Sequence, residues 1–138
     1  MIDRSSVRRI ARPAIAIVMT FASLSVGAAQ VRQDDRTWTA PAEAARRPNP
    51  LANRPETAGG GRKLFHERCA TCHGHDAEGT RKGPDLTAPD VQAQTDGALF
   101  WKITQGNTRT GMPTFSFLPE SQRWQLVLHL RVAAAASR

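Results

Sequence analysis

The residues with the clearest chemistry in this sequence form one short motif, Cys69-Ala70-Thr71-Cys72-His73. C-x-x-C-H is the attachment signature of a c-type haem. Two cysteines at this spacing present their sulfurs to the two vinyl groups of one porphyrin edge, and the histidine that follows is held below the iron as an axial ligand. The motif therefore predicts one covalently attached haem c, with Cys69 and Cys72 as the thioether attachments and His73 on the iron.

Two other chemistries could use the same residues. A disulfide between Cys69 and Cys72 could form in an oxidising compartment, although a thioredoxin-like motif needs a strand–turn–helix context that is not predicted here. A zinc site could combine both cysteines with His66 and either His73 or His75. Structural zinc ligands normally come from two separated clusters, whereas these candidates lie close together in the sequence. The sequence favours haem and leaves the disulfide and the zinc site as alternatives.

The iron position opposite His73 needs a sixth ligand or stays open. Met112 is the only methionine after residue 29, and it lies in a Gly-Met-Pro loop rather than on a helix face. A lone methionine is often core filler, but beside a c-type haem we favour Met112 as the second axial ligand. His66 and His75 are too near the attachment point to reach the other face of the ring. For His129, in the last predicted helix, we expect a core or interface role.

The elements that must position these residues are predicted to be helices joined by long loops. One short helical segment precedes the haem motif, and a second begins at the Thr95 cap and runs to Gln105. The last helix opens near Pro119, because proline is tolerated in the first turn. Residues 74–94 hold several glycines and prolines and are predicted to be mostly loop. No segment keeps the period-two alternation of a strand, so the fold is predicted to be all-α, with three to four short helices, long loops and no substantial sheet.

The size of the domain also points to a large cofactor. The 138 residues fit one domain with appendages. The part that carries the motifs has few aromatic side chains, and its loop at 74–94 has no core of its own. Domains this small often need a disulfide, a metal or a large cofactor for stability. A haem would supply the missing apolar area.

The first 29 residues are typical of a secretory signal peptide. Four arginines precede a short apolar stretch that ends in Gly27-Ala28-Ala29. The stretch is shorter than the roughly 18 residues of a membrane span, so we expect cleavage after residue 28 or 29, with an uncleaved anchor or a buried helix as the alternative.

Cleavage would lower the formal charge of the chain from +7 to +4. Since no basic run interleaved with aromatics remains, nucleic-acid binding is not expected.

Residues 30–58 form a polar, proline-rich N-terminal arm, and residues 59–138 form the predicted haem domain. Proline disfavours helix at and before its own position, so the arm is predicted to be extended or flexible. Trp38 either packs onto the domain or belongs to a mobile tail. The predicted location of the mature chain is the periplasm, with no stable membrane insertion after signal cleavage.

In these motifs the chain resembles small bacterial periplasmic class I cytochromes c, which carry a single haem with histidine and methionine as iron ligands. The resemblance covers roughly residues 59–133. It rests on four features in order, namely Cys69-x-x-Cys72-His73, Gly83-Pro84-Asp85-Leu86, Gly111-Met112-Pro113 and the last helix centred on Trp124. It implies the class I cytochrome c fold, wrapped around one haem.

The resemblance also implies contacts around the haem. The carbonyl of Pro84 would accept a hydrogen bond from the ring N–H of His73 and fix the ring. Leu86 would pack on the haem, and Trp101 would cover a haem edge, bond a propionate or pack in the core. A glycine before the motif, here Gly61, lets the last helix cross closely, usually against an aromatic residue of that helix.

For function, the resemblance implies a one-electron carrier and not an enzyme. The haem iron would cycle between Fe(III) and Fe(II) as the chain meets periplasmic redox proteins. It would bind these partners weakly, through a small patch. We expect the chain to be a monomer. One alternative is an electron-entry subunit of a larger dehydrogenase or oxidase. Another is a gas-binding or peroxidase-like haem protein, which requires that Met112 is not on the iron.

Overall fold

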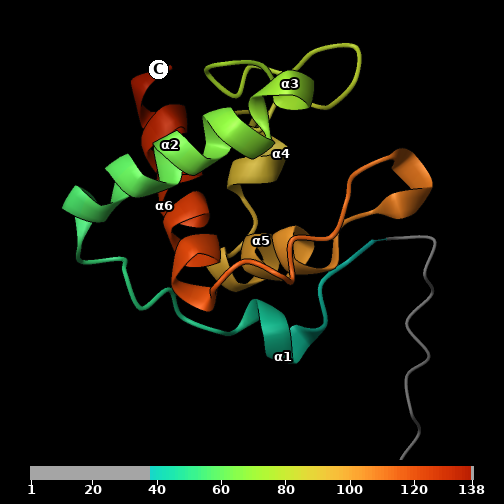
Figure 1. The fold of residues 1–138 in the computed structure, drawn as a ribbon. Helices are drawn as coiled ribbons and strands as arrows, with labels where there is room; N and C mark the ends of the chain where they lie inside the picture. Colours follow the sequence, from blue (N-terminus) through green and yellow to red (C-terminus); the bar gives the residue numbers. More distant parts are fainter. Residues whose placement is uncertain (1–37, 138) are drawn as a thin grey trace, which may run out of the picture. The chain divides into compact units, whose positions relative to one another are not determined.

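The computed structural model describes residues 38–137, so the predicted signal peptide at 1–29 lies outside the described part. Three helices of ten or more residues dominate this part: α2 (Ala58–Arg68), α5 (Asp96–Gln105) and α6 (Glu120–Ala136) (Figure 1). Five single turns complete the regular structure: α1 (Ala42–Ala45), η1 (Pro55–Thr57), α3 (Ala70–His73), α4 (Pro89–Gln92) and η2 (Thr108–Thr110).

The all-α prediction is confirmed for the described residues. From residue 38 to 137 the structure has no strand, and its one isolated β-bridge pairs Asn107 with Met112. None of the helices in this range is both long enough and apolar enough to cross a membrane.

The predicted helix ends at α5 and α6 agree with the structure. The Thr95 hydroxyl accepts a hydrogen bond from the Ala98 N–H at 3.2 Å, which caps the first turn of α5. Gly106 follows the last residue of α5 with a φ of 64°, a conformation that favours glycine. Helix α6 begins directly after Pro119. Residues 74–94 are mostly loop, as predicted, and hold the single turn of α4, where Pro89 presets the helical φ at the first position.

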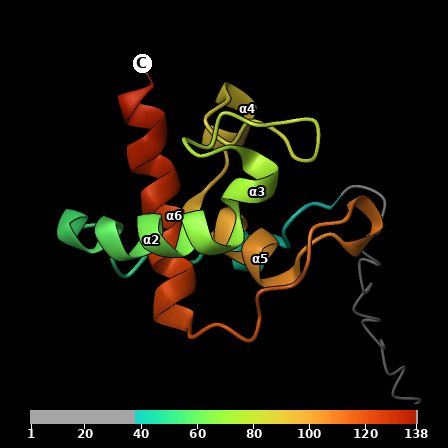
Figure 2. The ribbon, with the colours of Figure 1, turned by 45° about the horizontal axis from the view of Figure 1, so that its top comes forward.

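Helix α2 crosses α6, as Figure 2 shows, and the two helices come very close at Gly61. A Cβ atom at Gly61 would collide with the backbone carbonyl of Gln125 and lie 3.0 Å from Cβ of His129. The crossing therefore needs a residue without a side chain at position 61. The expected close approach of the last helix at this glycine is confirmed.

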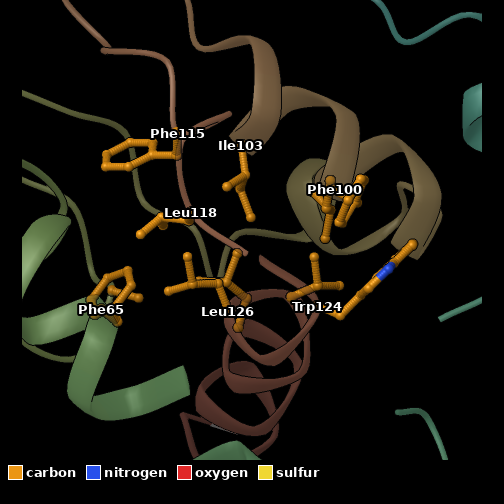
Figure 3. Close-up of a cluster of buried hydrophobic side chains, with 11 residues drawn as sticks. Phe65, Phe100, Ile103, Phe115, Leu118, Trp124 and Leu126 are labelled. Carbon is orange, nitrogen blue, oxygen red and sulfur yellow. The ribbon is translucent and has the colours of Figure 1, made fainter. Parts of the chain in front are cut away.

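The hydrophobic core lies between α2, α5, α6 and the segment after Met112 (Figure 3). Its largest fully buried side chains are Trp124, Phe65, Leu126 and Val127. The ring of Trp124 stacks on Phe100 of α5, with ring centroids 4.0 Å apart and planes 21° apart. Aromatic contacts of this kind add stability beyond the area that they bury, so Trp124 ties α6 to α5.

His129 takes the place of the usual aromatic at the α2–α6 crossing. It is 7% exposed, and its ring centroid lies 5.1 Å from that of Phe65. Within residues 38–137 its Nε2 atom has no hydrogen-bond partner. Burial lowers the pKa of His129, and the neighbouring His66 and Arg62 lower it further by charge repulsion. The side chain is therefore held neutral in the core.

We expect the wild-type protein to lose stability as the pH falls below about 6.5, and the His129→Phe variant to lose less. Because the folded pKa of His129 lies below its ordinary value, the unfolded chain takes up the proton first, and acid shifts the equilibrium toward unfolding. Thermal midpoints measured at about pH 7.5 and about pH 5 test this. His75→Gln, at an exposed position, is the control. Equal acid losses in wild type and His129→Phe would contradict the prediction.

The described part of the N-terminal arm packs on the domain. Helix α1 lies against α5, and a Cβ atom at Gly97 would collide with the carbonyl of Ala44. Trp38 donates a hydrogen bond to the backbone at the end of α5. The sequence left open whether Trp38 packs or belongs to a mobile tail, and the structure shows that it packs. From Trp38 onward the arm is therefore not a free extension.

Candidate haem site

One apolar cavity of about 380 Å³ brings the predicted site residues together. Cys69, Cys72 and His73 line it from the C-terminal end of α2 and from α3, and Met112 lines it from the loop that follows η2. The volume lies within the usual range of about 300–1,000 Å³ for small-molecule and cofactor sites. A smaller hollow of about 40 Å³ is also lined by Cys69, His73 and Met112 and extends toward the core.

The two cysteines lie at the corner between two helices. Cys69 ends α2 and precedes α3, and the Cys69 N–H donates to the Phe65 carbonyl at 2.7 Å. Cys69 is partly buried, Cys72 is exposed, and no disulfide joins them. Burial raises the pKa of Cys69 to about 12, with a smaller contribution from Cys72. The Cys69 sulfur is therefore uncharged at neutral pH, as it would also be in a thioether.

The alternative chemistries of the motif find no support here. The structure has no bond between Cys69 and Cys72. Among the residues from 38 to 137, no three or more His, Cys, Asp or Glu side chains are grouped so that they could hold a metal ion. His66 and His75 lie ring against ring, with centroids 4.0 Å apart, and neither lines the cavity.

The ring of His73 is fixed by the loop that follows the motif. Its Nδ1 atom lies 2.9 Å from the carbonyl oxygen of Pro84. Since a carbonyl can only accept, Nδ1 must carry the proton, which leaves the lone pair on Nε2. Gly83 packs against the same ring, because a Cβ atom there would lie 3.0 Å from ring atoms of His73. The hydrogen bond that the resemblance implied is present.

Hydrogen bonds to backbone carbonyls hold this loop to the haem motif. The Gly79 N–H donates to the His73 carbonyl at 2.7 Å, and the Thr80 hydroxyl donates to the Cys72 carbonyl at 2.5 Å. Leu86 lines the cavity, and its N–H donates to the Ala77 carbonyl at 2.8 Å. The loop at 74–94, which has little regular structure, therefore gains its shape from the motif and from the cavity wall.

Met112 is placed by a short paired turn. The Asn107 N–H donates to the Met112 carbonyl at 2.9 Å, and the Met112 N–H donates to the Asn107 carbonyl at 3.0 Å. Gly111, directly before it, has a φ of 91°, which L-residues with side chains rarely adopt. The side chain of Met112 is partly buried and packs against the core. The Gly-Met-Pro pattern thus codes for a fixed turn that brings the thioether to the cavity.

One predicted site residue lies elsewhere, and some lining residues were not predicted. Trp101 on α5 is partly buried but is not among the residues that line the cavity. Its neighbours Leu99 and Ile103 line it instead, and their i, i+4 spacing was the available signal. Trp38, from the arm, also lines the cavity, and no local pattern in the sequence indicated this.

The charges at the cavity are of one sign. Arg68, Lys82 and Lys102 line it, and no Asp or Glu is among the described lining residues. Burial lowers the pKa of Lys102, and Asp90 partly offsets the effect. Apolar walls with a basic rim match a flat, largely apolar group that carries two carboxylates. The residues present therefore fit a haem attached through Cys69 and Cys72.

Comparison with known proteins agrees with this chemistry. Residues 56–130, which include the haem motif, Pro84 and Met112, match the family described as Cytochrome C oxidase, cbb3-type, subunit III. No curated protein and no solved structure matches the chain. The match covers more than half of the 138 residues, and this family's domain carries a covalent haem c. The chain therefore belongs to the cbb3-type cytochrome c oxidase subunit III family, whose domain is a class I-like c-type cytochrome with a single haem.

Proposed function

We propose that this chain carries single electrons between redox proteins outside the cytoplasm, with His73 and Met112 as the two axial ligands of the haem. The observation that carries the proposal is that an imidazole and a thioether line the same apolar cavity as both cysteines. When bound, the haem supplies a one-electron Fe(III)/Fe(II) couple. If His73 and Met112 both hold the iron, neither oxygen nor a substrate would find an open position on it.

The chain's own residues adapt the site to this role. The Pro84 carbonyl fixes the His73 ring and raises the basicity of Nε2. A thioether ligand and an apolar cavity both favour the reduced state and so raise the potential. The Asn107–Met112 pairing holds the thioether in place. A site held this firmly needs little rearrangement between oxidation states.

A second candidate is an electron-entry subunit of a larger oxidase. The family description, which names an oxidase subunit, favours it. The haem site would be the same, and only the partner would differ. Fractionation of the native cell distinguishes the two candidates, because a free carrier is released with the periplasmic fraction and a subunit purifies with the oxidase in the membrane fraction.

The mass of the mature chain tests the predicted cleavage after residue 28 or 29.

The visible spectrum of the exported protein tests the proposed ligands. Expressed with haem-maturation machinery, the wild type is expected to show a low-spin haem c, a far-red thioether–iron band when oxidised, and slow binding of carbon monoxide when reduced. The double variant Cys69→Ala, Cys72→Ala is the control for haem that is not covalently attached. A high-spin spectrum with rapid carbon monoxide binding would overturn the carrier and favour a gas-binding or peroxidase-like protein.

A further inference from the structure

We propose that residues 38–49, which lie before the residues matched by the family, form a strap that closes the cavity wall beside Met112. In this strap Trp38 is the positioning residue. The proposal deepens the proposed function, because it concerns how the chain shields the site where Met112 would bind the iron. It assigns a role in the haem site to a segment outside the cytochrome domain.

The contacts of Trp38 place it at this wall. Its Nε1–H donates to the Gly106 carbonyl at 2.8 Å. Gly106 directly precedes Asn107, whose backbone pairs with that of Met112. Nζ of Lys102 lies 4.6 Å from the centre of the Trp38 ring, within the range of a cation–π contact. Trp38, Lys102, Asn107 and Met112 all line the cavity. The indole therefore covers the turn that positions the thioether.

The backbone of Trp38 is strained, which indicates that its contacts fix it. Its φ is 42°, in a region that a bulky residue rarely occupies. Strained residues of this kind persist only where the surrounding structure holds them, and they concentrate at functional sites and ligand clamps. At Trp38 the hydrogen bond to Gly106 and the charge of Lys102 supply that support.

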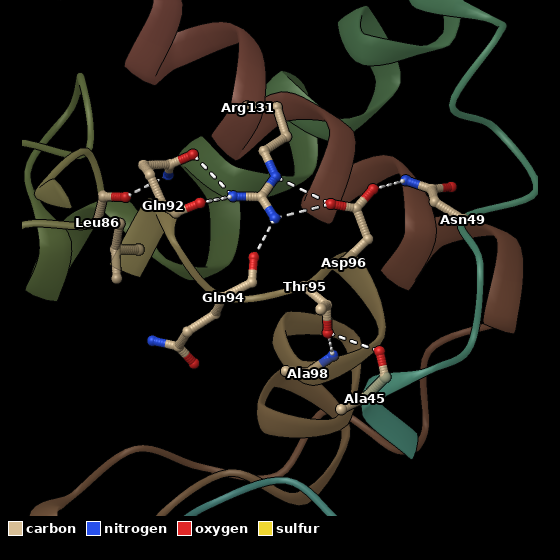
Figure 4. Close-up of polar contacts among 9 residues, drawn as sticks. All are labelled: Ala45, Asn49, Leu86, Gln92, Gln94, Thr95, Asp96, Ala98 and Arg131. Atoms are coloured by element: carbon tan, nitrogen blue, oxygen red, sulfur yellow. Dashed lines mark hydrogen bonds and ion pairs between the residues drawn. The ribbon is translucent and has the colours of Figure 1, made fainter. Parts of the chain in front are cut away.

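The strap is then tied along α5. The Thr95 hydroxyl donates to the Ala45 carbonyl at 2.6 Å (Figure 4). At Gly97 a Cβ atom would lie 2.9 Å from the Ala45 carbonyl oxygen and 2.8 Å from that of Arg47. The strap and the first turn of α5 thus meet backbone to backbone. A contact this close needs both the cap and the glycine.

The C-terminal end of the strap is fixed to α5 and α6. Nδ2 of Asn49 donates to Oδ2 of Asp96 at 3.0 Å, and Oδ1 of Asp96 pairs with Nη2 of Arg131 at 2.8 Å (Figure 4). Arg47 reaches Glu120 at 2.7 Å, and its guanidinium lies 4.9 Å from the centre of the Phe100 ring. These anchors lie away from the cavity, since none of the six residues lines it.

This separation of anchors and wall makes the strap testable. Loss of the indole would open the cavity beside Met112 to water and to small ligands, while the anchors at Arg47 and Asn49 stay in place. Water near the haem favours the oxidised state, so the midpoint potential would fall. Loss of an anchor would instead lower stability without opening the wall.

The experiment compares Trp38→Ala, Trp38→Phe and Arg47→Gln with wild type, each as the full exported haem protein. Imidazole is mixed with the oxidised protein, and its association rate, the midpoint potential and the thermal midpoint are measured. We expect Trp38→Ala to bind imidazole about tenfold faster, the effect of a barrier lower by about 1.4 kcal/mol, with a lower potential. Trp38→Phe should keep most of the wild-type rate, because its ring still covers the wall. Arg47→Gln should lower the thermal midpoint and leave the imidazole rate unchanged.

Two results would overturn the strap. One is an equal imidazole rate in wild type and Trp38→Ala. The other is an equal acceleration in Trp38→Ala and Arg47→Gln, which would indicate general loosening rather than an opened wall. The result is separable from the fate of the proposed function. If the wild type lacks the far-red band, Met112 is not the ligand, yet imidazole still reports whether Trp38 closes the cavity.

Discussion

Replacing Met112 by alanine is expected to abolish the far-red band of the oxidised protein and to lower the midpoint potential by on the order of 100 mV or more, within the about 0.8 V that axial ligands span. The thioether is a soft ligand that favours Fe(II), and the described part of the chain brings no other methionine or free histidine to the cavity. The variant's reduced form should also bind carbon monoxide rapidly. Spectra and a redox titration measure both effects.

Met112→Leu separates ligation from packing. Leucine keeps an apolar side chain of similar volume, and such exchanges usually cost less than about 1.5 kcal/mol of stability. We therefore expect Met112→Leu to lose the band as completely as Met112→Ala while it keeps a higher thermal midpoint than Met112→Ala. A band that survives in either variant would show that the sixth ligand is another group, and the assignment of Met112 would be wrong.

Features that short stretches of sequence determine could be predicted. The C-x-x-C-H motif occupies one helical corner, the Thr95 cap and Gly106 bound α5, and the turn before Pro113 is set by Gly111. In each case a few adjacent residues fix the backbone by caps, by φ or by covalent spacing. The resemblance added the contact between His73 and Pro84, which the structure shows at 2.9 Å.

Features that depend on pairing between distant irregular segments could not be predicted. Trp38 meets Gly106 through one side-chain bond to a backbone carbonyl 68 residues away, and such a bond leaves no periodicity in the sequence. Gln92 and Gln94 both accept from Arg131 through their backbone carbonyls. Every residue type has a backbone carbonyl, so the identity of the residues at these two positions does not reveal the contact. The polar composition of 30–58 therefore suggested a flexible arm, although its contacts from residue 38 onward lie on the domain.

Gly61→Ala is expected to destabilise the haem protein by about 3 kcal/mol, at the upper end of the usual cost of overpacking. A methyl group at this position would collide with the Gln125 carbonyl, which is backbone in the middle of α6 and cannot rotate away. Helix α2 or α6 would have to shift, and the shift would disturb the buried Phe65 and His129 at the crossing. For a domain with a total stability of about 5–15 kcal/mol, this is a large share.

Gly59→Ala is the matched control, because it makes the same change in the same helix. A Cβ atom at Gly59 would meet nothing within 4 Å. Alanine is the better helix former by up to about 1 kcal/mol, so this variant should be slightly more stable than wild type. Denaturant midpoints of the three proteins give the comparison. If Gly61→Ala proved as stable as Gly59→Ala, α6 would not lie against α2 at this glycine. The scaffold that carries the C-x-x-C-H corner onto the core would then need another explanation.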